Sequence, residues 1–183
     1  IKAVLNQFKP MDCEQGKIRI GTMGDGGYVV PNDLDGIDKV VSLGVGVDVS
    51  FDEVFANQGA NIYQYDHTVD NVPIENENFH FQKQQWVPVG SPDGKSLPEI
   101  CEDNGIISTN NAILKFDVEG DEWLCLREVP ADLFKHFRII VCELHGLHNL
   151  ANDGFLFGAW SIMNKLLYSH QVVHFHINNC CGV

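Results

Sequence analysis

Basic residues are scarce in this sequence: 12 Lys and Arg stand against 25 Asp and Glu in 183 residues, and the formal net charge is −13. No run of Lys or Arg offsets this excess of acid. Because nucleic acids carry a negative charge on every phosphate, a surface of this kind repels them. We therefore expect no nucleic-acid partner.

Long apolar runs and paired cysteine motifs are also missing. No stretch approaches the roughly 20 apolar residues of a membrane-spanning helix, and the first residues lack the basic start and apolar core of a signal peptide. The six cysteines include no CxxC pair, so we interpret them as reduced thiols, with Cys180 and Cys181 as the exception to watch. These absences predict a cytoplasmic protein with no membrane partner in this segment.

At 183 residues with 44% hydrophobic residues, the chain is long enough for one well-buried domain and too short for two. We expect a single domain over 1–183. Residues 1–36 are predicted to form a lead-in helix, which ends before Pro10, and a β-hairpin with a glycine-rich loop. Residues 37–183 are predicted to form an α/β core.

From residue 39 onward, strand patterns alternate with helix patterns. Such alternation predicts a mostly parallel sheet with helices on both faces. The run over 137–144 is almost continuously apolar, which is typical of a strand covered on both sides. Strands are expected at 39–44, 60–66, 79–81, 112–118, 137–144 and 171–177, and helices at 50–58, 96–103, 121–128 and 155–169.

The first strand of this core runs into a glycine turn. Gly44 and Gly46 follow the apolar residues, and Ser50 is predicted to cap the helix that comes next. An acid, Asp66, ends the following strand 22 residues after Gly44, the spacing at which doubly wound folds bind ribose hydroxyls. A plain strand-to-helix turn without a ligand is the alternative. The predicted contacts to a nucleoside cofactor are Gly44, Gly46, Asp48, Ser50, Asp66 and His67.

Polar residues gather where the later strands end. Asp117 lies at the end of the fourth strand, Glu143 and His145 at the end of the fifth, and His176 and Asn178 at the end of the sixth. Side chains at i and i+2 point to one face of a strand, and ligands of parallel sheets lie beyond the carboxyl ends of the strands. We therefore expect Asp117, Glu143 and His145 to line one acceptor site, with His176 or Asn178 nearby.

Two kinds of chemistry suit the three central residues of this site. His145 is the candidate general base. Alternatively, Asp117, Glu143 and His145 hold a divalent cation, since their oxygen ligands suit magnesium and the imidazole suits manganese or zinc. Asp121 and Glu122 are interpreted as caps of the next helix.

Five stretches together resemble the FkbM-type family of S-adenosylmethionine-dependent methyltransferases. They are GDGGY at 24–28, SLGVGVD at 42–48, YDHT at 65–68, LKFDVEGDEW at 114–123 and ELH at 143–145, and the resemblance spans residues 17–179. It implies an α/β, three-layer Rossmann-like methyltransferase fold, S-adenosylmethionine as cofactor, and a hydroxyl acceptor on a sugar or other small molecule.

The sequence departs from the common pattern of that family at two points. Ser42 stands where an acid is usual, and the sequence ends before the antiparallel strand that would complete the sheet. Two other functions fit the same polar rim: a metal-dependent hydrolase, and a nucleoside-cofactor-binding module without catalysis.

Overall fold

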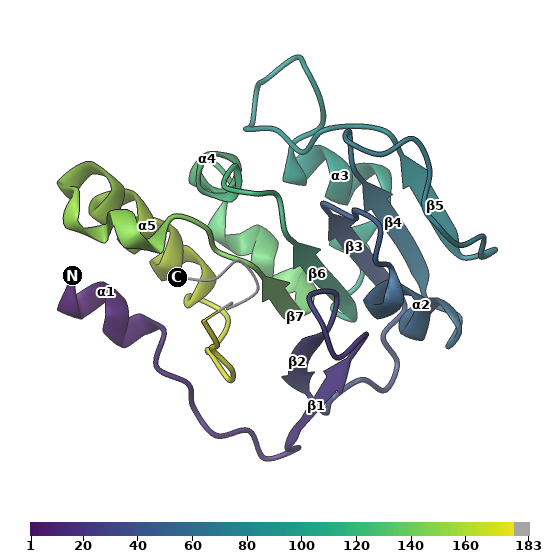
Figure 1. The fold of residues 1–183 in the computed structure, drawn as a ribbon, viewed down its shortest axis with the longest axis horizontal. Coiled ribbons are helices and arrows are strands. Elements are labelled where there is room, and N and C mark those ends of the chain that lie inside the picture. The colour runs from purple at the N-terminus through teal and green to yellow at the C-terminus, as the bar shows by residue number, and fades with distance from the viewer. Residues whose placement is uncertain (178–183) are drawn as a thin grey trace.

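A five-stranded parallel sheet forms the centre of the protein (Figure 1). In the computed structural model, which describes residues 1–177, the strand order is β5-β4-β3-β6-β7, and every neighbouring pair is parallel. The chain runs outward from β3 to β5 and then returns to the other side of β3. The order therefore reverses between β3 and β6, which is where open α/β sheets form their ligand crevice. The strands are β3 (Lys39–Leu43), β4 (Asn61–Tyr65), β5 (Phe79–Gln82), β6 (Ala112–Phe116) and β7 (Phe137–Cys142).

Helices lie on both faces of this sheet, as the alternating pattern predicts. On one face, in front in Figure 1, α2 (Ser50–Ala56) packs together with the antiparallel hairpin of β1 (Lys17–Ile20) and β2 (Tyr28–Pro31). The opposite face is covered by the remaining helices: α3 (Leu97–Asp103), α4 (Glu122–Arg127) and α5 (Asp153–Leu166), with α1 (Lys2–Gln7) beside α5. Short 3-10 helices occur at Ile106–Ser108, Ala131–His136 and Leu147–Ala151.

The two apolar cores follow from the alternation of side chains along the strands. Val40 of β3 belongs to the core beneath α2, and Val41 belongs to the core beneath α3, α4 and α5. All five residues of β6 are buried, as expected for a strand in the middle of a covered sheet. The α/β architecture expected from the sequence is therefore present.

The predicted role of Ser50 as a helix cap was wrong. Ser50 is the first residue of α2, and its backbone N–H donates to Asp48 Oδ1 at 2.9 Å. The Ser50 hydroxyl instead accepts from Thr22 N at 3.0 Å and donates to the Gly26 carbonyl at 3.4 Å. Asp48 thus accepts the hydrogen bond from the first N–H of α2, as in an Asx-type turn. The Ser50 side chain binds the hairpin loop instead.

The predicted sixth strand, 171–177, was also wrong. The segment forms no strand, and the Val172 carbonyl accepts from Met11 N at 2.8 Å. Phe175 lies 5.2 Å from Phe8 between ring centroids. The apolar residues of this segment therefore pack against the chain around α1. An alternating pattern predicts that one side of a segment is buried, but it does not specify the surface that buries it. Asn178 lies outside the described residues.

The described cysteines agree with the expectation of reduced thiols. Cys13, Cys101, Cys125 and Cys142 are free, and Cys180 and Cys181 fall beyond residue 177.

Between residues 1 and 177, no helix combines the length and the apolar character that a bilayer crossing requires.

Gly44 offers a test of how the first turn is seated. Its φ is +74°, and a Cβ there would lie 1.7 Å from the Asp117 carbonyl oxygen. Gly36 has nearly the same φ, +75°, with nothing within 4 Å of a Cβ. We expect Gly36→Ala to cost about 1–2 kcal/mol for the left-handed backbone alone. Gly44→Ala should cost about 2–5 kcal/mol, because the overlap adds to this strain.

Urea unfolding of both variants beside the wild type measures the difference. Equal losses of stability in the two variants would show that the turn does not press on the end of β6.

Candidate active site

The glycine turn lies at the reversal point of the sheet. Gly44 N donates to the Tyr65 carbonyl at 2.9 Å, and Asp117 N donates to the Leu43 carbonyl at 2.9 Å, so the turn is bonded to the ends of both neighbouring strands. Gly46 has a φ of +57°, and a Cβ there would meet nothing within 4 Å. The outer side of the turn is therefore open, while its inner side is closed against β6.

Asp66 holds this turn in place. Its Oδ2 accepts from Val45 N at 2.8 Å and Gly46 N at 2.9 Å. Its Oδ1 accepts from the N–H and the hydroxyl of Thr68, both at 2.7 Å. Burial acts to raise the pKa of the Asp66 carboxyl, but these hydrogen bonds outweigh it and the pKa is lowered. The ribose contact predicted for Asp66 stays a prediction, and a ribose hydroxyl would share oxygens that already accept four bonds.

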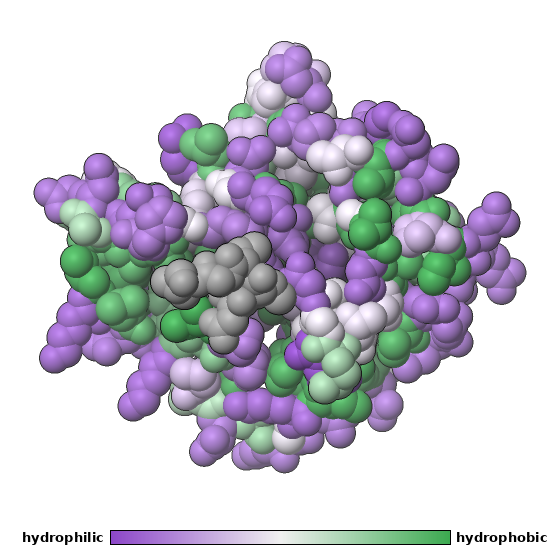
Figure 2. Space-filling model, viewed as in Figure 1, coloured by the Kyte–Doolittle hydropathy of each residue, from purple (hydrophilic) through white to green (hydrophobic). Residues whose placement is uncertain are grey.

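Asp48 connects the turn to the loop of the β1–β2 hairpin. Its Oδ2 accepts from the Thr22 hydroxyl at 3.0 Å, and hydrogen bonding to Ser50 lowers the pKa of its carboxyl. Val47, beside it, is 82% exposed, and His67 is also exposed. Figure 2 shows mainly hydrophilic surface over the middle of this face. The hairpin loop therefore forms one wall of the region above the turn.

Asp117, Glu143 and His145 come together at the ends of β6 and β7, as the strand pattern predicts. His145 Nε2 lies 3.8 Å from Asp117 Oδ1 and 3.7 Å from Glu143 Oε2. One ligand atom from each of the three residues lies within 4.8 Å of the other two. We call these three residues the rim cluster. Its position beside Gly44 places it at the reversal point.

The sequence predicts that Asp121 and Glu122 both cap α4. Asp121 occupies the N-cap position, but its side chain makes no capping hydrogen bond. Glu122 is fully buried and accepts from His145 N at 2.6 Å and Gly120 N at 2.9 Å. It thereby ties α4 to the loop after β7, and Trp123 Nε1 donates to the His145 carbonyl at 2.7 Å. Glu119 reaches His145 Nε2 at 3.6 Å, and its φ of 56° is the one positive value of a non-glycine residue within 1–177.

The rim cluster concentrates negative charge in partly dry surroundings. Burial raises the pKa of Asp117 to about 6, and the neighbouring Glu143 carboxylate adds to this rise. Asp117 Oδ1 is buried and accepts no hydrogen bond from the part of the chain that the structure describes. Perturbed carboxylates of this kind gather at functional sites.

A buried polar row beneath α2 was missed altogether. Gln64, Ser42 and Lys115 face one another across β4, β3 and β6, and Asp52 of α2 lies above them. Gln64 Nε2 donates to Asp52 Oδ2 at 2.8 Å. Burial raises the pKa of Asp52, an effect that the Lys115 charge opposes.

Lys115 connects this row to the turn. It is 4% exposed, and its Nζ donates to the Gly44 carbonyl at 3.2 Å and lies 5.7 Å from the Tyr28 ring centroid. The available signal was a single lysine inside the otherwise apolar run 112–116. A buried charge must find a partner, so such a lysine indicates a polar interior contact.

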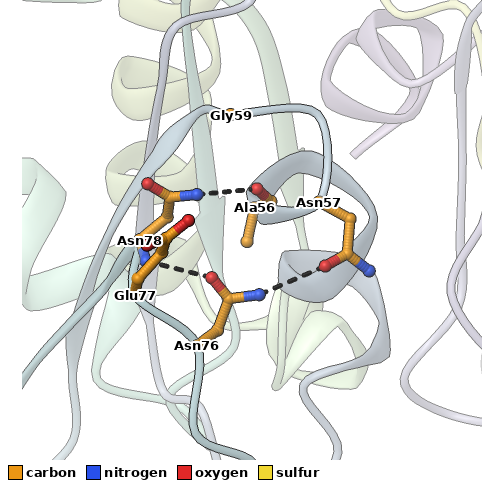
Figure 3. Close-up of a pocket in the computed structure, with 6 residues that line it drawn as sticks. All are labelled: Ala56, Asn57, Gly59, Asn76, Glu77 and Asn78. Atoms are coloured by element: carbon orange, nitrogen blue, oxygen red, sulfur yellow. Dashed lines mark hydrogen bonds between the residues drawn. The ribbon is translucent and has the colours of Figure 1, made fainter.

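Two hollows lie near the edges of the sheet. One, of about 430 Å³, is at the amino ends of β4 and β5, away from the rim cluster, and its asparagines bond to one another and to the end of α2 (Figure 3). The other, of about 220 Å³, lies between residues 85–93 and the start of α4. Trp86 Nε1 in its wall is buried and has no hydrogen-bond partner among residues 1–177. Of the two, the second hollow lies on the side of the carboxyl ends of the strands.

In comparisons with known proteins, the chain matches no family model, no curated protein and no solved structure.

The hydrogen bonds of Asp66 predict how the stability of the protein changes in acid. Replacing it by Ala removes hydrogen bonds to a charged group, so Asp66→Ala should lose about 2–4 kcal/mol at pH 7. Because folding lowers the Asp66 pKa, its contribution is complete above the ordinary value of 3.8 and is lost as the pH falls through the still lower folded value. The gap between wild type and variant should therefore close below about pH 4.

Urea unfolding at pH 3, 5 and 7 measures this gap, with the exposed Asp12→Ala as control. A gap that does not change with pH would contradict the assigned hydrogen bonds.

Proposed function

We propose that the protein is an S-adenosylmethionine-dependent methyltransferase that methylates a hydroxyl of a sugar or other small molecule. The observation that carries this proposal is the position of the rim cluster, directly beside the glycine turn at the reversal point of a parallel sheet. When bound, S-adenosylmethionine supplies a methyl group whose bond to sulfur breaks as the acceptor oxygen bonds to the carbon. The resemblance of the five sequence stretches to FkbM-type methyltransferases points to the same reaction.

The turn fits a nucleoside cofactor on its open side. No atom of residues 1–177 lies within 4 Å of where a Cβ of Gly46 would be, so its backbone is open to a ligand from that side. An acid is missing at Ser42, and the buried Asp52 of α2 lies above it in the polar row, bonded to Gln64 at 2.8 Å.

The rim cluster fits the acceptor. An attacking hydroxyl must lose its proton as it is methylated, and the cluster offers three groups that can take or direct that proton. The Glu122 carboxylate and the Trp123 indole fix the backbone of His145 from below. The backbone from which the imidazole projects is therefore fixed, which helps to position an acceptor oxygen beside it.

A metal-dependent hydrolase is the second candidate, because the atoms of the rim cluster also have the mutual distances of metal ligands. It predicts that S-adenosylmethionine does not bind. A module without catalysis predicts binding without turnover on any acceptor.

Cofactor binding is the first test. S-adenosylmethionine titrated into the wild type in a calorimeter should bind one to one. Asp66→Ala should weaken binding by about 1–3 kcal/mol, because a buried ligand group loses its partner and the turn loses its support. Asp12→Ala is the control, and circular dichroism confirms that each variant is folded. No heat of binding with the wild type would reject the proposal.

Turnover is the second test. With a panel of sugar and small-molecule alcohols, we expect methyl transfer by the wild type, and His145→Ala should reduce turnover about 10²- to 10⁴-fold. Affinity for S-adenosylmethionine should stay nearly constant, since His145 lies on the acceptor side. The exposed His148→Ala is the matched control. Full activity in His145→Ala would remove the rim cluster from the reaction.

A further inference from the structure

The orientation of the His145 ring carries information about what it binds. Its Nδ1 lies 3.4 Å from Glu122 Oε1, and Glu122 is fully buried and held by two backbone N–H groups. The two atoms are at ion-pair distance, and Nδ1 makes no hydrogen bond with any residue of 1–177. The Nδ1 side of the ring thus faces Glu122, and Nε2 is the nitrogen that faces the rim cluster. Histidines that bind metals are commonly oriented by a carboxylate in this way.

Nε2 faces three carboxylate oxygen atoms. Asp117 Oδ1, Glu143 Oε2 and Glu119 Oε2 lie 3.6 to 3.8 Å away, which is ion-pair range and too long for hydrogen bonds. The carboxylates that carry these atoms repel one another. A positive charge between them removes the repulsion, and Asp117 Oδ1 is a buried acceptor without a hydrogen bond from any residue of 1–177.

The distances fit a small cation. Two ligand atoms that are each about 2.0–2.2 Å from one metal ion are about 2.8–3.6 Å apart at tetrahedral or adjacent octahedral positions. The three ligand atoms of the rim cluster lie within 4.8 Å of one another, so small side-chain movements bring them to this spacing. The side chain of Glu119 is 88% exposed and can complete the coordination from the solvent side.

We propose that the rim cluster binds one divalent transition-metal cation through Asp117, Glu143 and His145 Nε2, with Glu122 as the positioning residue for the imidazole. One nitrogen and several carboxylate oxygens favour manganese or zinc over magnesium and calcium. The role of the cation rests on the proposed function, in which it lowers the pKa of the acceptor hydroxyl. Its binding does not depend on that function.

Direct binding measurements test the site without cofactor or acceptor. Protein treated with a chelator and then freed of it is titrated with Mn²⁺, followed by electron paramagnetic resonance, and with Zn²⁺ in a calorimeter. We expect one site per chain, and pulsed spectra of bound Mn²⁺ should show coupling to an imidazole nitrogen. His145→Ala should lose that coupling, and both His145→Ala and Asp117→Asn should bind at least about 100-fold more weakly.

Glu122 is tested by a variant that keeps its shape. Glu122→Gln should weaken binding of Mn²⁺ about 10- to 100-fold and change the nitrogen coupling, because the ring loses its charged partner. Glu128→Gln, at an exposed acid at the end of the same helix, should leave both unchanged. Unfolding curves establish that each variant is folded at the temperature of the titration.

The competing occupant of this space is a proton on Nε2, which would make His145 a cation itself. In that case neither Mn²⁺ nor Zn²⁺ binds stoichiometrically, and the proposal is overturned. Binding that persists in Asp117→Asn and His145→Ala overturns it as well. If the cation binds and S-adenosylmethionine does not, the methyltransferase fails and the metal site stands. If S-adenosylmethionine binds and the cation does not, the metal site is rejected, and His145 remains the candidate base for methyl transfer without a metal.

Discussion

The close approach of Gly44 to the end of β6 is the constraint on which the arrangement depends. Because Gly44 has no side chain, the turn can lie against the Asp117 carbonyl on one side while it hydrogen-bonds to Tyr65 on the other. The open side of Gly46 and the first member of the rim cluster thereby become neighbours. A bulkier turn would separate the open side of Gly46 from the rim cluster.

Polar interactions, rather than apolar packing, hold the turn in this position. Asp66 bonds its backbone N–H groups from one side, and Lys115 bonds the Gly44 carbonyl from beneath. Both are almost fully removed from solvent, where a hydrogen bond to a charge is strong and an unpaired charge is costly. The turn is therefore a defined feature before any ligand arrives, which lowers the cost of binding one.

The rim cluster combines opposite requirements. Burial, and after it the neighbouring Glu143 carboxylate, raise the pKa of Asp117, while Glu122 and Trp123 anchor the loop that carries His145. Interactions around the cluster thus hold together carboxylates that are partly desolvated and that repel one another. Such arrangements are typical of sites that are completed by a ligand.

The order of strands and helices, the glycine turn and the meeting of Asp117, Glu143 and His145 were determined by the sequence, because periodicity and strand-end position are local properties. Tertiary structure decided how α2 begins at Ser50, why residues 171–177 form no strand, and which partners Glu122 and Lys115 bind. Each depends on a partner distant in the chain: the hairpin loop, the chain around α1, the loop after β7, and the turn above β6. No local pattern specifies such partners, since they are brought close only when the sheet has formed.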